Sequence, residues 1–205
     1  MRKQLFFILA VFAVVLLSTK PLLAEYTYYN DNSYRKNTRE NPDTFDIQAS
    51  IGIDYVYSDV EIDDIFEDYI PHTFNSYNIS LGTRFGKYVG LEAFYQKSND
   101  ADGNILGYNV STNFQAYGID LNLYGPTQYD NLFALLSLGA GNYNYEASIL
   151  NFKEDDDCLG IRVAAGLQVD ITKHFAIRMQ GRLIWLDSES IDHMREFTIG
   201  TRIYF

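Results

Sequence analysis

The residues best suited to acid–base chemistry in this chain are three histidines, His72, His174 and His193. Only His193 has candidate partners close by in the sequence, namely Ser188, Ser190 and Asp192. Catalysis by such a group needs a nucleophile or an acid within hydrogen-bond reach of the base. Proximity along the chain does not provide that geometry, and we predict no catalytic residues and no enzyme activity.

Metal-binding chemistry has weak support in the sequence. Cys158 is the single cysteine, so no intrachain disulfide is possible, and no Cys/His spacing resembles a zinc site. Two segments are strongly acidic: 59–68, with Asp59, Glu61, Asp63, Asp64, Glu67 and Asp68, and 154–157, with Glu154, Asp155, Asp156 and Asp157. Their spacing does not match the EF-hand loop. We predict no metal site and no cofactor, and we interpret the acids as solvated surface charge.

A third set of charges lies on one face of segments with strand-like alternation. Its members are Arg84, Glu92, Asp120, Arg162, Asp170, Arg178, Arg182, Glu196 and Arg202. Five cations and four acids on a shared face can form ion pairs, and a confined interior requires such pairing because an unpaired buried ion is costly. We predict that these residues form a charge network inside the fold.

The elements that position these charges follow a period of two. In residues 45–57, apolar Phe45, Ile47, Ile51 and Ile53 alternate with small or polar residues. This is the pattern of a strand with two different faces. The same reasoning predicts eight strands, at 45–57, 77–85, 89–96, 115–123, 132–145, 159–170, 175–185 and 196–205. The apolar parity changes near Asn142, which suggests a β-bulge there.

The connections between these strands alternate strictly between long and short. Long polar connections follow the first, third, fifth and seventh strands, and short ones follow the second, fourth and sixth. The apolar face ends in aromatics: Phe85, Phe175 and Phe205 near the short turns, and Tyr57, Tyr95, Trp185 and Phe197 near the long loops. These features predict an all-β, eight-stranded, antiparallel up-and-down transmembrane barrel. The alternative is a soluble, lipocalin-like barrel, which would keep its apolar face inside.

Three regions follow from composition. Residues 1–24 have a basic start, an apolar stretch and a small-residue end, which predicts a signal peptide. Residues 25–44 are polar and show neither strand nor helix periodicity, which suggests a periplasmic leader. Residues 45–205 form the predicted barrel. The formal net charge of −11 argues against nucleic acid as a partner.

The final strand carries the most specific signal. Thr198, Gly200, Ile203 and Phe205 match the terminal assembly signal of outer-membrane barrels position by position. Together with the alternating strands, this makes residues 45–205 resemble the small eight-stranded barrels of the OmpA transmembrane domain, OmpX, OmpW and opacity-protein group. The resemblance implies a place in the bacterial outer membrane and recognition by the barrel-assembly machinery.

Eight strands enclose an interior just wide enough for side chains, so we expect a plugged barrel that acts through its loops. The predicted role is structural or in surface interaction, that is, adhesion or envelope integrity. Two alternatives are a narrow, porin-like channel and a lipid A-modifying enzyme. Expected partners of a monomeric barrel are outer-membrane lipid, lipopolysaccharide and a host or envelope protein bound through the loops. A divalent-cation bridge from the acidic loops to lipopolysaccharide phosphates is the alternative to solvated surface charge.

Overall fold

A computed structural model of the chain describes residues 47–62, 72–105, 108–149, 152–188 and 191–205. The predicted signal peptide and leader lie outside these residues, and so do Asp63, Asp64, Glu67 and Asp68 of the first acidic segment. Within the described part of the chain, no helix is long and apolar enough to cross a membrane.

All regular structure in the described residues is β-strand. The strands are β1 (Ile47–Ile62), β2 (Thr73–Phe85), β3 (Val89–Ser98), β4 (Ala101–Ile105), β5 (Tyr108–Pro126), β6 (Leu132–Ile149), β7 (Phe152–Thr172), β8 (Phe175–Leu186) and β9 (Ile191–Tyr204). Each strand is antiparallel to its neighbours. The all-β prediction is confirmed.

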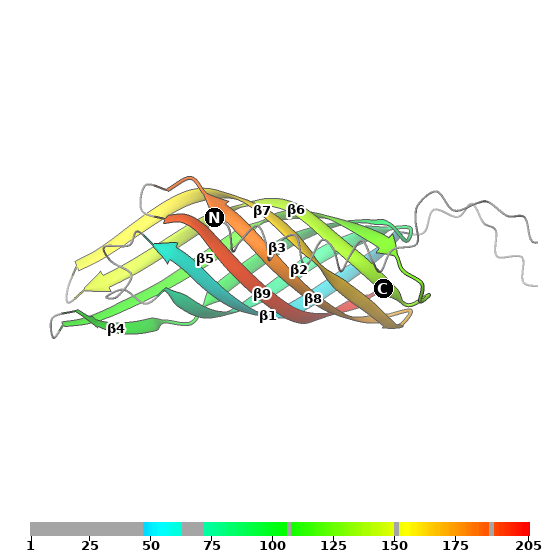
Figure 1. Cartoon of the computed structure of the whole chain (residues 1–205), viewed down its shortest axis with the longest axis horizontal. Helices are drawn as coiled ribbons and strands as arrows, with labels where there is room; N and C mark the ends of the chain where they lie inside the picture. Colours follow the sequence, from blue (N-terminus) through cyan, green and yellow to red (C-terminus); the bar gives the residue numbers. More distant parts are fainter. Residues whose placement is uncertain (1–46, 63–71, 106–107, 150–151, 189–190) are drawn as a thin grey trace, which may run out of the picture.

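The strands close into one tilted barrel (Figure 1). Their order is β3-β2-β1-β9-β8-β7-β6-β5-β4, and a further pairing of β3 with β5 joins the two ends. β3 pairs with residues 115–123 of β5, and β4 pairs with residues 108–112 of the same strand. β4 therefore continues the position of β3, and the barrel has eight strand positions, as the sequence predicts.

The two ends of the barrel differ in their connections. Short turns join β2 to β3, β5 to β6 and β7 to β8, and we call this side the turn end. Gly86 in the first turn has a φ of 59°, a left-handed conformation that glycine adopts without strain. At the opposite side, which we call the loop end, β4 and the hairpin of β6 and β7 reach furthest from the C terminus (Figure 1).

Several strands are longer than the sequence predicts. The expected loop at 97–110 contains β4 and the start of β5, and the expected loop at 147–157 contains the end of β6 and the start of β7. The predicted bulge near Asn142 is wrong, because β6 keeps an unbroken register with both neighbours through Asn142. Register shifts occur instead at Glu61/Ile62 and Asp170/Thr172.

The outward face carries a continuous apolar band. It runs over residues 47–57, 77–85, 89–95, 117–123, 134–140, 159–169, 175–185 and 197–205. Tyr57, Tyr95, Trp185 and Phe197 are exposed at its loop-end edge, and Phe205 is exposed at its turn-end edge. An aliphatic band between aromatic edges is the exterior that a lipid bilayer requires. Beyond this band the strands continue as a projecting section, residues 58–62, 72–76, 96–105, 108–116, 141–149, 152–158 and 191–196.

Candidate functional site: the barrel interior

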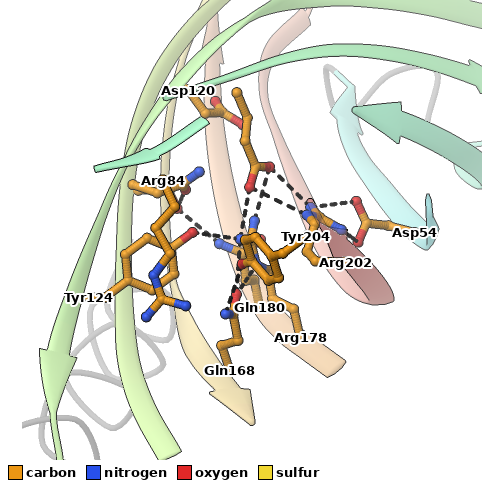
Figure 2. Close-up of polar contacts among 12 residues, drawn as sticks. Asp54, Arg84, Asp120, Tyr124, Gln168, Arg178, Gln180, Arg202 and Tyr204 are labelled. Atoms are coloured by element: carbon orange, nitrogen blue, oxygen red, sulfur yellow. Dashed lines mark hydrogen bonds and ion pairs between the residues drawn. The ribbon is translucent and has the colours of Figure 1, made fainter. Parts of the chain in front are cut away.

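The lumen is crossed by a layer of buried ion pairs, which we call the charge layer. Glu92 lies at its centre and accepts hydrogen bonds from Arg178 at both carboxylate oxygens, at 3.0 and 2.8 Å. Arg202 reaches the same carboxylate at 3.3 and 3.2 Å. The fork of a guanidinium matches two carboxylate oxygens, so this arrangement is strong and directional. Figure 2 shows Arg178 and Arg202 projecting into the lumen from neighbouring strands.

Neutral side chains complete the surroundings of Arg178. Its Nη2 also donates to the hydroxyl of Tyr124 at 2.9 Å, and its Nε donates to Gln168 Oε1 at 3.1 Å. The amide of Gln168 in turn donates to the hydroxyl of Tyr204 at 3.0 Å. A buried charge needs hydrogen-bond partners, and Arg178 receives them from three strands, β3, β5 and β7.

Three further pairs fill the layer on either side. Arg162 bonds Asp120 through Nε at 2.6 Å and through Nη2. Arg84 and Asp170 pair at 2.9 Å near the turn end, and Arg182 and Glu196 pair at 3.3 Å. The nine residues predicted from the sequence therefore all lie in the lumen, and each has an oppositely charged partner.

A tenth residue, Asp54, was missed by the sequence reasoning. Its carboxylate accepts two hydrogen bonds from Arg202, at 2.7 and 3.1 Å, and one from Asn78 at 2.7 Å. Asp54 makes the layer electrically balanced, with five arginines and five acids. Its even position in the alternation of residues 45–57 was the signal that could have placed it on the charged face.

Inward-facing glycines supply the space for these side chains. A Cβ at Gly82 would lie 2.5 Å from Glu92 Cγ, and one at Gly52 would lie 2.6 Å from Arg202 Cζ. Added Cβ atoms at Gly139 and Gly200 would overlap Asp120 and Asp54. The glycines therefore leave room that neighbouring ion pairs occupy.

Above the charge layer, at the loop end, the lumen is apolar. A cluster that we call the apolar plug consists of Val60, Phe74, Phe94, Phe114, Ala116, Tyr143, Cys158, Ile184, Leu186 and Met194. Phe74 and Phe114 meet edge to face, with ring centroids 5.4 Å apart. Arg162 covers the boundary between the two layers, because its Cζ lies 3.5 Å from the ring centroid of Phe94. Buried ion pairs thus cross the middle of the lumen, and apolar side chains gather at its loop end.

The polarity of the wall is therefore reversed between the two parts of the barrel. Within the outward apolar band, apolar side chains face out and charges face in. In the projecting section, Phe114 and Tyr143 are fully buried, whereas Asn113 and Asn144 face outward and are partly exposed. This reversal explains the parity change near Asn142, which the sequence reasoning attributed to a bulge. The strand continues, and the surroundings change from lipid to water.

The terminal signal residues occupy both faces of β9. Thr198 and Gly200 face the lumen, while Ile203 and Phe205 face outward and are exposed. The end of the strand is bonded on both sides: Phe205 N donates to Ala49 O, and Tyr204 N donates to His174 O, both at 2.9 Å.

Of the other candidate groups, the structure describes hydrogen bonds of Ser188, Asp156 and Asp157. Ser188 donates to Asp156 at 2.9 Å, and Asp157 accepts from Asn144 at 2.8 Å, so Asp156 binds the segment after β8 and Asp157 binds β6. The side chains of Ser190 and Asp192 lie outside those described. Among the described residues, no group of three or more His, Cys, Asp and Glu side chains is placed to hold a metal ion.

Comparison with known proteins supports this architecture. The family model described as outer membrane protein beta-barrel domain matches residues 36–205. No curated protein sequence matches the chain significantly.

Solved structures with the same fold come from several bacteria. The chain resembles the attachment invasion locus protein Ail of Yersinia pestis, with 18% identity and a TM-score of 0.57 over 77% of this chain and 98% of that one. It resembles Neisserial surface protein A with 11% identity and a TM-score of 0.58, over 78% and 97% of the two chains. The N-terminal barrel domain of Pseudomonas aeruginosa OprF matches at 17% identity and a TM-score of 0.50, over 75% and 97%.

Proposed function

The chain belongs to the outer membrane protein beta-barrel domain family and is a protein of the bacterial outer membrane, and from that premise we propose that it is a closed barrel that acts through its projecting section. In an outer-membrane barrel the short turns face the periplasm and the longer connections face outside. The projecting section then stands on the cell surface. The proposed role is surface interaction, as adhesion or as maintenance of envelope integrity.

The observation that carries this proposal is the filled lumen. Five buried arginines pair with five acids across the barrel, and the apolar plug occupies the loop end above them. An eight-stranded barrel is narrow enough for its own side chains to fill the interior, and we infer that these side chains leave solutes no water-lined route. The porin-like alternative therefore has no supporting observation among the described residues, and neither does lipid A chemistry. We therefore assign the function to the projecting section, which extends beyond the lipid into water.

The projecting section is suited to a surface role because it has a buried apolar core of its own. Phe114 meets Phe74 edge to face and lies tilted against Tyr145, with ring centroids 5.4 Å apart in both contacts. The outward side chains above the membrane are free to vary without disturbing this core. The name of Ail, the attachment invasion locus protein of Yersinia pestis, supports such a role for a barrel of this fold.

The experiment compares cells that lack the protein with cells that carry one of three forms. The first is wild type, and the second is the triple variant Asn113→Lys, Asn144→Lys and Asp157→Lys, which changes outward groups of the projecting section. The third is a matched control at the turn end, Gln128→Lys, Asp130→Lys and Asn131→Lys. The assays are attachment to host-cell monolayers and leakage of a periplasmic enzyme.

We expect cells without the protein to attach less or leak more, and we expect wild type and the turn-end control to correct this defect. The projecting-section variant should fail to correct it although it reaches the membrane in equal amounts. The proposal is wrong if loss of the protein changes neither property, or if both triple variants behave like wild type.

A further inference from the structure

Lys97 is an exposed cation at the boundary between the outward apolar band and the projecting section. It follows Tyr95, the last outward aromatic of β3, by two residues and so points to the same side. Its direct neighbours across the sheet are Tyr77 on β2 and Gln115 on β5. Lys97 forms no ion pair with any residue in the described ranges.

Tyrosine hydroxyls orient the two amides nearest to this lysine. Tyr95 donates to Gln115 Oε1 at 3.1 Å, and Tyr55 donates to Asn75 Oδ1 at 2.5 Å. Each amide carbonyl is therefore occupied, and each amide NH2 group is left as a donor on the outer surface. Gln115 lies directly opposite Lys97, and Asn75 lies diagonally from it on the other neighbouring strand. The surface thus presents an ammonium group between two amide donors.

The carboxylate closest in sequence to this group is already bound. Asp100, three residues after Lys97, accepts a hydrogen bond from Asn113 Nδ2 at 3.0 Å. The remaining surroundings are aromatic, since Tyr77, Tyr95 and Tyr117 are all exposed beside the lysine. A cation, two amide donors and tyrosine rings together suit a ligand that has an oxyanion attached to a ring with a nonpolar face.

We propose that Lys97, Gln115 and Asn75 bind the phosphorylated sugar headgroup of lipopolysaccharide. The site lies at the outer-leaflet interface of the barrel, where tyrosines mark the headgroup level and where this glycolipid presents its phosphates. The ammonium group binds the phosphate, the amides donate to phosphate or hydroxyl oxygens, and Tyr77 and Tyr117 contact the sugar. Binding at this site needs no divalent cation. It does not depend on whether the projecting section serves adhesion or envelope integrity.

The test measures lipid binding to the refolded full barrel by native mass spectrometry. The probes are diphosphoryl lipid A, the same lipid A without its phosphates, and phosphatidylglycerol. The variants are Lys97→Gln and, as a matched control, Lys87→Gln, which removes an exposed lysine at the turn end. Gln115→Leu tests the amide. Heat-dependent gel migration verifies that every variant is folded.

We expect Lys97→Gln to weaken binding of diphosphoryl lipid A about fivefold, the effect of one interfacial cation, and Gln115→Leu to weaken it less. Lys87→Gln should bind like wild type, and removal of the phosphates should abolish the difference between wild type and Lys97→Gln. Equal binding by wild type and Lys97→Gln would overturn the proposal. An equal loss for phosphatidylglycerol would overturn the assignment to a sugar phosphate, because any lipid phosphate would then suffice.

Discussion

Arg202 on the last strand and Asp54 on the first strand form a two-point ion pair across the seam where the barrel closes, with Nη1–Oδ1 and Nη2–Oδ2 distances of 2.7 and 3.1 Å. Both side chains are 1% exposed. The pair links the residues of the chain that are furthest apart in sequence within the charge layer. Closure of the barrel and charge balance in its lumen therefore depend on the same contact.

The first prediction concerns this seam. Asp54→Ala should lower the free energy of unfolding by about 3–5 kcal/mol, because it removes one partner of a buried pair and leaves Arg202 with less compensation. Asp170→Ala is the comparison, since Asp170 is 25% exposed at the rim of the lumen and water can replace the lost carboxylate in part. Urea unfolding in detergent micelles measures both. Equal losses of unfolding free energy for the two variants would contradict the claim that the buried pair at the seam stabilises the barrel more than the pair at the rim.

A second prediction compares two glycines that are required for different reasons: Gly139 because a side chain has no space there, and Gly86 because its backbone is left-handed. A Cβ at Gly139 would overlap Asp120 and lie 3.1 Å from Arg162 Cγ, whereas a Cβ at Gly86 would meet nothing within 4 Å. Gly139→Ala should therefore disturb an ion pair and cost about 1–3 kcal/mol through overpacking. Gly86→Ala should cost about 1–2 kcal/mol from its left-handed backbone alone.

The two glycine variants differ most clearly in combination with Asp120→Ala. Gly139→Ala should be strongly non-additive with that change, because both act on the same pair, and Gly86→Ala should be additive. Unfolding free energies of the single and double variants decide this. Additivity in both combinations would contradict the packing assigned to Gly139.

The sequence predicted the barrel well because alternation is a local property of each strand. Glu92 and Phe94, for example, face the lumen as their parity requires. The terminal pattern and the loop asymmetry then fixed the class of barrel. What alternation could not give is the partner of each charge, since Glu92 is shared by Arg178 and Arg202 from strands far away in the chain.

The strand ends were predicted less well, for a physical reason. Apolar parity marks a strand only while the medium on each side stays the same. In the projecting section the outer face of β6 meets water, and the bulky Tyr143 and Tyr145 occupy the inward positions. The sequence reasoning assigned this change of residue types to a bulge at Asn142, although the register is unbroken. Bulky inward residues opposite outward asparagines were the available signal for a strand that continues into water.

A third prediction concerns the apolar plug. Phe114 is fully buried, so Phe114→Ala should leave a cavity and cost about 3–5 kcal/mol. Leu121→Ala on the same strand removes a side chain that faces outward, where lipid fills the space, and should cost much less. Equilibrium unfolding of both variants in lipid vesicles tests the difference. A loss for Leu121→Ala as large as that for Phe114→Ala would contradict the placement of the plug.

A fourth prediction concerns the terminal residue. Phe205 is 69% exposed, so its side chain contributes little packing inside the barrel. Deleting Phe205 should reduce the amount of protein that reaches the outer membrane of living cells, while refolding of the purified variant in detergent stays near wild type. Phe197→Ala, another outward phenylalanine on β9, is the control and should assemble normally. Unchanged membrane levels after the deletion would mean that the terminal signal is not read.

The central claim is that ion pairs and the apolar plug close the lumen, and single-channel recording in planar lipid bilayers tests it most directly. Wild-type protein, refolded and shown to be in the bilayer, should give no steady current above the baseline at any salt concentration. A stable unitary current that rises with salt concentration, and whose ion selectivity changes in Arg178→Ala while the unfolding free energy does not, would contradict the closed lumen and identify a narrow channel.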